Sequence, residues 1–140
     1  VQPMTDALIK DVLTRTRRIA VVGVSPNPAR PSHYVAEYLA QKGYDVVPVN
    51  PVHAGKEVFG ETIVATLAEI DPPVQMVDIF RRSEDVPPVV DEALEAFPEL
   101  ETIWMQMGIT NAEAAAKAEA RGVDVIQDRC PKVEIPRLMG

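Results

Sequence analysis

Basic and polar side chains follow the apolar runs of this sequence, at the points where each run ends. Arg81 and Arg82 come directly after the run 75–80, and Ser25 follows the run 19–24. The arginine guanidinium is planar and permanently charged, so it suits a phosphate group. Hydroxyl groups and the backbone N–H groups at the start of a helix also bind phosphate. These residue types predict a site for a phosphorylated ligand.

The loop after the first run is the main candidate for that site. A dinucleotide-binding fingerprint places G-x-G-x-x-G here, but only Gly23 is present, and prolines occupy positions 26, 28 and 31. Because proline has no N–H, this loop does not wrap a pyrophosphate in the standard way. Ser25, Asn27 and Arg30 remain able to meet a phosphate, together with the start of the next helix. The alternative is a stiff surface loop without a ligand.

Further candidates stand at the end of the second run, 45–49. Asn50 and Pro51 are able to form a wall against a flat base. His53 and Lys56 follow and are able to reach an anion, although a lone histidine in a loop is more often simply solvated.

The third run ends in Ile79 and Phe80, whose backbone groups are expected to meet the edge of a base. Phe80 fits the hydrophobic core at least as well, because large aromatic residues are usually buried. The two arginines that follow are equally able to pair with Glu84 and Asp85.

The run 102–106 ends in Gln106, Met107 and Gly108, and the glycine permits close approach of a ligand. Cys130 is the single cysteine, and no histidine is its neighbour in sequence, so we favour an inert, half-buried thiol. Two distant histidines and one cysteine are too few for a metal centre. We therefore expect no catalytic and no metal-ligating residues.

The alternation of apolar runs with helical patterns positions these residues. Strands are predicted at 19–24, 45–49, 75–80, 102–106 and 124–126. Helices are predicted at 5–16 with Thr5 as the N-cap, at 32–42, at 62–70, from about 87, and at 111–121 with Asn111 as the N-cap. The tail 128–140 has only weak periodicity. Such alternation predicts an α/β fold, a three-layer, doubly wound, Rossmann-like five-stranded parallel sheet with flanking helices, in the order 3-2-1-4-5. The ligand then lies at the carboxyl ends of the strands.

Composition restricts the classes of function. The chain has 140 residues, the size of one domain, so residues 1–140 are expected to form a single binding domain. A net charge of -7 argues against general nucleic-acid binding. The apolar runs are too short for a membrane span, and the start of the chain lacks the order of a signal peptide. A lone cysteine suits a reducing compartment, and we expect a cytoplasmic protein.

The joint order of several motifs resembles the small CoA-binding proteins and the N-terminal CoA-binding domain of the succinyl-CoA synthetase α subunit. The motifs are Ile19–Ser25, Arg30–Ser32, Tyr38-Leu39, Gly43–Val46, Pro48–Pro51, Val77–Arg81, Met107-Gly108, Asp128–Pro131, Glu134 and Pro136–Leu138. They span nearly the whole chain, and each is weak alone.

The resemblance implies a Rossmann-like domain that holds CoA or acyl-CoA across the carboxyl ends of its strands. It assigns CoA contacts to the loop 25–28 and to the ends of the third and fourth strands. With the candidates above, the expected binding residues are Gly23, Val24, Ser25, Pro26, Asn27, Pro28, Arg30, Asn50, Pro51, Lys56, Ile79, Phe80, Arg81, Gln106, Met107 and Gly108. The synthetase has a Thr-Glu pair where Gln106-Met107 stands here, and its phosphorylated histidine belongs to a second domain.

Three functional hypotheses remain open. The first is non-enzymatic binding of CoA or acyl-CoA. The second is a module of an NAD(P)-dependent oxidoreductase, although Asn50 replaces the acidic residue that normally takes the ribose hydroxyls. The third is a CoA-responsive regulatory or scaffold protein with a protein partner or a homo-oligomeric state. A narrower hypothesis is a mixed disulfide between Cys130 and the CoA thiol.

Overall fold

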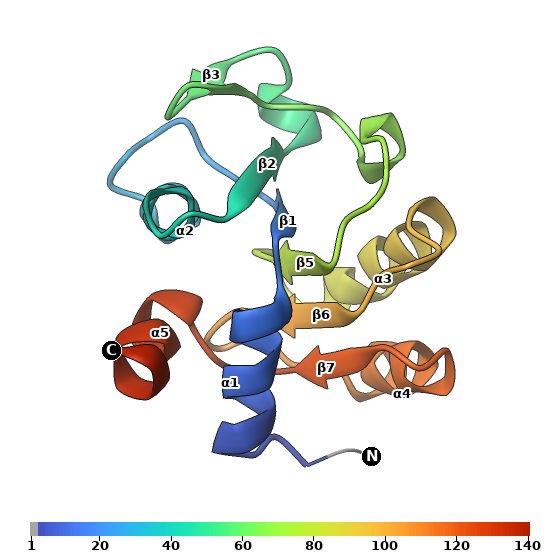
Figure 1. Cartoon of the computed structure of the whole chain (residues 1–140). Coiled ribbons are helices and arrows are strands. Elements are labelled where there is room, and N and C mark those ends of the chain that lie inside the picture. Colours follow the sequence, from blue (N-terminus) through green and yellow to red (C-terminus); the bar gives the residue numbers. More distant parts are fainter. Residues whose placement is uncertain (1–2) are drawn as a thin grey trace.

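The computed structural model describes residues 3–140, so Val1 and Gln2 lie outside the described residues. Five parallel strands form the central sheet in the order β2-β1-β5-β6-β7 (Figure 1). These strands are β1 (Arg18–Val22), β2 (Asp45–Val49), β5 (Met76–Ile79), β6 (Thr102–Met105) and β7 (Asp124–Ile126). A separate two-stranded hairpin consists of β3 (Glu57–Val58) and β4 (Glu61–Thr62). The predicted α/β class with a parallel five-stranded sheet is confirmed.

Helices cover both faces of the sheet. On one side lie α1 (Asp6–Arg15), α2 (Pro31–Gln41) and α5 (Pro131–Met139), and on the other lie α3 (Val86–Ala96) and α4 (Ala112–Ala120) (Figure 1). Three short 3-10 helices complete the chain: η1 (Pro51–His53), η2 (Leu67–Glu69) and η3 (Ser83–Asp85). No helix within residues 3–140 is long and apolar enough to cross a membrane.

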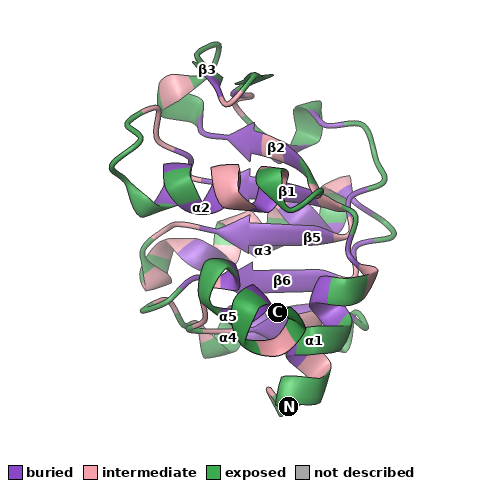
Figure 2. Cartoon of the chain, turned by 60° about the vertical axis from the view of Figure 1, so that its left-hand side comes forward, coloured by how far each residue is buried: buried purple, intermediate pink, exposed green. Residues whose placement is uncertain are grey.

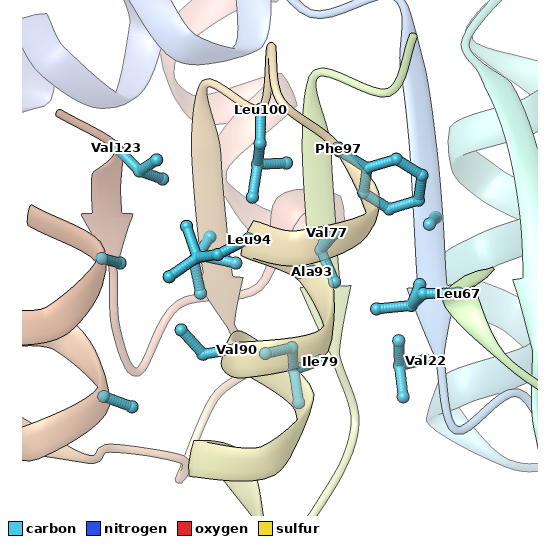
Figure 3. Close-up of a cluster of buried hydrophobic side chains, with 14 of the residues drawn as sticks. Val22, Leu67, Val77, Ile79, Val90, Ala93, Leu94, Phe97, Leu100 and Val123 are labelled. Carbon is cyan, nitrogen blue, oxygen red and sulfur yellow. The ribbon is translucent and has the colours of Figure 1, made fainter. Parts of the chain in front are cut away.

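Each sheet face packs into its own apolar cluster, because successive strand residues point to opposite sides. Val77 and Ile79 of β5 meet Val90 and Leu94 of α3 in one cluster (Figure 3). Met76, their neighbour in the same strand, belongs to the cluster under α1, α2 and α5. The strands are thus buried on both sides, as their unbroken apolar runs predict.

Two helix starts agree with the predicted capping residues. The Thr5 hydroxyl accepts a hydrogen bond from the Leu8 N–H at 3.1 Å, and α1 begins at Asp6, directly after Thr5. The Asn111 side chain accepts one from the Ala114 N–H at 2.9 Å. Side chains of these types satisfy N–H groups that have no partner within the helix.

The predicted strand order 3-2-1-4-5 is wrong, because the third strand of the sheet, β5, pairs with β1 and not with β2. The outer edge of β2 is occupied by Val64, which donates to the Pro48 carbonyl at 3.0 Å and accepts from the Asn50 N–H at 2.9 Å. Pro48 presents its nitrogen, which carries no hydrogen, to that same edge. Because a proline removes a ladder hydrogen bond, β2 is suited to an edge position.

Two further differences from the predicted elements concern short or proline-containing segments. The helix predicted over 62–70 is limited to η2, and the tail forms α5 despite Pro136 inside it. Burial against the sheet and ion pairs together hold this last helix. Arg137 donates to Glu134 at 2.6 Å within α5 and to Asp6 of α1 at 2.9 Å.

Gly23 should be the most restrictive glycine of the chain, because its φ is +97° and an added Cβ would lie 2.2 Å from the Phe80 carbonyl oxygen. We expect Gly23→Ala to lower the free energy of unfolding by about 3 kcal/mol or more, through strain and a backbone clash together. Urea unfolding followed by circular dichroism measures this loss.

Gly43 provides the matched control, since its φ is +99° and an added Cβ would meet nothing within 4 Å. Gly43→Ala should cost only about 1 kcal/mol, the cost of the backbone conformation alone. Equal losses in the two variants would contradict the close approach of Gly23 to Phe80.

Candidate functional site

The strand order places a change of direction between β1 and β5. From β1 the chain proceeds to β2 on one side, whereas from β5 it proceeds to β6 and β7 on the other. Ligands of open parallel sheets bind in the crevice outside the carboxyl ends at such a point. Val22, Ile79 and Met105 are paired level with one another there, so the segments that follow them emerge at one edge.

A cavity of about 820 Å³ lies at this edge. The segments after β5 and β6 supply half of its lining, namely Phe80, Arg81, Arg82, Gln106, Met107 and Ile109. The amino-terminal parts of α2 and α5, together with Cys130 directly before α5, supply the other half, namely Pro31, Tyr34, Val35, Cys130, Lys132 and Val133. Most of this wall is apolar, and its volume is within the range of about 300–1,000 Å³ typical of small-molecule sites.

Three cations line the cavity, and they differ in what already binds them. Arg82 pairs with Asp85 at 3.0 Å and with Glu84 at 3.3 Å. The Lys132 ammonium lies 4.9 Å from the centre of the Tyr38 ring, a cation–π contact. Within residues 3–140, Arg81 has neither a hydrogen bond nor an ion pair from its side chain. Its charge is therefore available to a ligand.

The loop after β1 is fixed by its own hydrogen bonds. The Ser32 hydroxyl accepts from the Ser25 N–H at 3.0 Å, the Ser25 hydroxyl accepts from the Asn27 N–H at 3.1 Å, and the Asn27 side chain accepts from the Ala29 N–H at 3.0 Å. The Arg30 N–H donates to the Asn27 carbonyl at 3.0 Å. Four N–H groups of this loop therefore have partners already, and the loop delivers the chain to the start of α2.

The structure brings four of the predicted binding residues together on the cavity wall. These are Phe80, Arg81, Gln106 and Met107. The glycine beside them, Gly108, is exposed and donates its N–H to the Asp128 carboxylate at 2.6 Å.

The predicted residues from the first two loops do not line the cavity. The predicted residues of the first loop lie outside the cavity wall and lead to Pro31, which lines it: Gly23, Val24, Ser25, Pro26, Asn27, Pro28 and Arg30. Ile79 of β5 is also absent from the wall, because it is fully buried.

The second loop, after β2, uses its polar side chains elsewhere. The Asn50 side chain donates to the Val24 carbonyl at 3.0 Å and accepts from the Val52 N–H at 3.0 Å. Pro51 and Lys56 are exposed, and the Lys56 ammonium lies 3.4 Å from His53. Asn50 therefore stabilises the contact between two loops.

The α5 side of the cavity was not predicted, because the tail 128–140 has only weak periodicity. Trp104 anchors this side, because its indole N–H donates to the Arg129 carbonyl at 2.9 Å, next to Cys130. The sequence contains one signal for it, namely Pro131 directly after Cys130, since proline favours the first turn of a helix.

A second missed feature is the contact of Gln106 with a buried acid, Asp78. Asp78 lies in the interior of β5, a strand that is buried throughout (Figure 2), and its side chain is fully inaccessible. With the Gln106 amide nitrogen turned toward it, that nitrogen lies 2.9 and 3.1 Å from the two carboxyl oxygens. Burial raises the pKa of Asp78 well above its usual value, and a hydrogen bond from the backbone of Ile79 lowers it by less.

A model of the CoA binding domain family matches residues 17–136. The chain is 42% identical over 132 residues to the protein YneT of Bacillus subtilis (strain 168), an alignment that covers 94% of this chain and 95% of that protein.

Solved structures agree with the fold. A Thermus thermophilus structure, described as cell-free ID.343, is 38% identical, has a TM-score of 0.90, and is matched over 97% of this chain and 100% of that one. The dinucleotide forming acetyl-coenzyme A synthetase 1 of Ca. Korarchaeum cryptofilum is 22% identical with a TM-score of 0.63. That match covers 77% of this chain and 25% of the synthetase, and it supports the fold alone.

Asp78 gives the protein a stability that depends on pH. The native state favours the neutral carboxyl, so the protonated Asp78 adds to the free energy of unfolding. This stabilisation is complete below the ordinary pKa of 3.8 and is lost as the pH rises from there toward the raised pKa. We expect Asp78→Asn, which cannot ionise, to gain stability relative to the natural protein as the pH increases above about 4.

Urea unfolding of both proteins at several pH values between 4 and 8 measures that difference, because all other titrating groups are shared. A difference that stays constant over this range would contradict a raised pKa at Asp78.

Proposed function

The chain belongs to the CoA binding domain family, and on that premise we propose that it binds CoA or acyl-CoA at the carboxyl edge of its sheet without transforming it. The observation that carries this proposal is the cavity of about 820 Å³, which combines apolar walls with the unpaired Arg81. CoA has the corresponding chemistry, since it joins a phosphorylated nucleotide to a long arm of low charge.

We place the phosphate groups near Arg81 and the start of α2. This helix has 11 residues and no side-chain cap. Pro31 carries no N–H, and His33 and Tyr34 donate theirs to the Arg30 carbonyl, so the Ser32 N–H and the helix dipole are what favour an anion there. Arg30 directly precedes this helix, and Lys132 lines the cavity from α5 with its ammonium over the Tyr38 ring of α2, so both add positive charge. These cations also explain how a chain of net charge -7 accepts an anionic ligand.

The nucleotide base and the arm follow from the position of the phosphates. We propose that the base lies against the loops after β1 and β2, which include residues 23–28, Asn50 and Pro51, with Lys56 nearby. The backbone at Ile79 and Phe80 and the segment 106–108 then face the remainder of the ligand. A few charge-assisted hydrogen bonds, less the cost of association, correspond to an affinity of roughly 1 μM at best.

Binding without catalysis agrees with the chemistry of the wall. Among the described residues that line the cavity, the one strong nucleophile is Cys130, and neither His33 nor His53 lines the cavity beside it. The Cys130 thiol therefore has no histidine base at the cavity wall.

Isothermal titration calorimetry with CoA tests the proposal directly, and saturable heat with a micromolar dissociation constant is the expected result. We expect Arg81→Gln to weaken CoA binding about tenfold, because it removes a charge-assisted hydrogen bond to phosphate. The salt dependence of binding should decrease in the same variant.

Arg17→Gln is the matched control. It removes the same charge from an exposed arginine at the amino end of β1, away from the cavity, and should leave the dissociation constant within about twofold. Binding of NADPH with no binding of CoA would reject the proposal in favour of an NAD(P)-dependent module.

A further inference from the structure

We infer that Gln106, held in place by Asp78, recognises an amide group of the ligand at the inner end of the cavity. Gln106 is the binding residue in this proposal, and Asp78 is its positioning residue. The inference rests on the proposed function, which it deepens by stating which part of the ligand enters the cavity.

The burial of Asp78 lowers the stability of the fold, and no cation pairs with its carboxyl group within residues 3–140 to offset that loss. The other buried acid, Glu134, is 3% exposed and pairs with Arg137 at 2.6 Å and with Arg129 at 3.5 Å. Asp78 is 0% exposed and has no ion pair within residues 3–140. Because a well-packed apolar residue is usually at least as stable at such a position, a carboxyl group here indicates a role beyond packing.

Gln106 connects this carboxyl group to the cavity. Asp78 pairs in register with Trp104, and Gln106 is two residues further along the chain, so it lies on the same face and one step closer to the carboxyl edge. Its side chain is 5% exposed and forms part of the cavity wall. Gln106 alone therefore separates a ligand in the cavity from the buried Asp78 carboxyl group.

Asp78 holds one end of the Gln106 amide and leaves the other end for the ligand. With the amide nitrogen turned toward Asp78, that nitrogen lies 2.9 and 3.1 Å from the two carboxyl oxygens. With the amide oxygen turned there instead, a protonated carboxyl donates to it. The Gln106 side chain forms no other hydrogen bond within the described part of the chain. A polar amide end in a largely apolar wall selects a ligand group that pairs with it, and it penalises one that leaves it unpaired.

An amide group on an otherwise weakly polar ligand segment fits, because it both donates and accepts hydrogen bonds. Two kinds of ligand carry it: the pantetheine arm of CoA, with its amide groups, and a nicotinamide dinucleotide, with its carboxamide. The chemistry at Gln106 is the same for both, and the titrations below separate them.

The experiment compares the affinity for CoA with the affinity for the phosphorylated ADP that remains when the pantetheine arm is removed. The affinity for CoA divided by the affinity for this nucleotide measures the contribution of the arm alone. A general loss of structure weakens both ligands and leaves this ratio unchanged. We expect Gln106→Leu to lower this ratio about fivefold, with the arm-free nucleotide bound as before.

Three further variants separate positioning from packing. Asp78→Leu should lower the ratio as Gln106→Leu does, because the amide is no longer oriented. Asp78→Asn retains an acceptor for the amide nitrogen and should keep the ratio within about twofold. Thr102→Val is the matched control, since Thr102 is buried on the same face of β6 at its other end and its hydroxyl has no partner. It should leave the ratio unchanged.

The results distinguish the inference from the function on which it rests. An unchanged ratio in Gln106→Leu, or equal weakening of both ligands, would overturn the inference while CoA binding stands. If the natural protein binds neither CoA nor NADPH, the proposed function fails and the inference fails with it. Binding of NADPH that Gln106→Leu weakens, with no binding of CoA, would support amide recognition and assign the amide to the nicotinamide. If Asp78→Leu does not fold, the affinity ratio of Gln106→Leu compared with that of Thr102→Val tests the inference.

Discussion

The pairing of β5 with β1 determines where the loops of this protein meet. Since Pro48 lacks an N–H and Val64 covers the outer edge of β2, a further strand has no ladder to join there. The chain instead crosses back and pairs on the other side of β1. That reversal separates the connection after β1 from the connection after β5, and the cavity lies where they diverge. The same contact requires a glycine at position 23, because the loop passes against the Phe80 carbonyl.

The last helix closes the cavity, and tertiary contacts rather than local propensity hold it, because Ile135 is buried in the apolar cluster on this face of the sheet. Arg137 joins Glu134 of α5 to Asp6 of α1, so the two ends of the chain are tied on one face of the sheet. Trp104 fixes the entry to α5 from inside the sheet. As a result, Cys130, Lys132 and Val133 form a wall that the βα units alone would not provide. Buried Glu134 has a clear structural role, whereas buried Asp78 has no cation partner in the described chain and meets only Gln106 and the Ile79 backbone.

Polar groups around the cavity divide into those already used by the fold and those left for a ligand. The first loop satisfies its own N–H groups, and Asn50 joins that loop to the one after β2. Arg81 and the outer end of the Gln106 amide have no partners in the described chain. This division supports a binding site in which the protein is rigid and few groups carry the recognition.

Local chemistry determined much of this protein. The buried strands, the capping residues Thr5 and Asn111, and Phe80, Arg81, Gln106 and Met107 at the strand ends were all predictable, because periodicity, capping and residue type act over a few neighbours. Strand order, the last helix and the contact between Asp78 and Gln106 were decided by tertiary structure. Each depends on partners far along the chain, such as Val64 beside Pro48 or Asp6 beside Arg137, and no local pattern encodes which distant partner will be there. Pro48 was the one local sign of an edge strand, and its meaning became clear only when the position of its missing N–H was known.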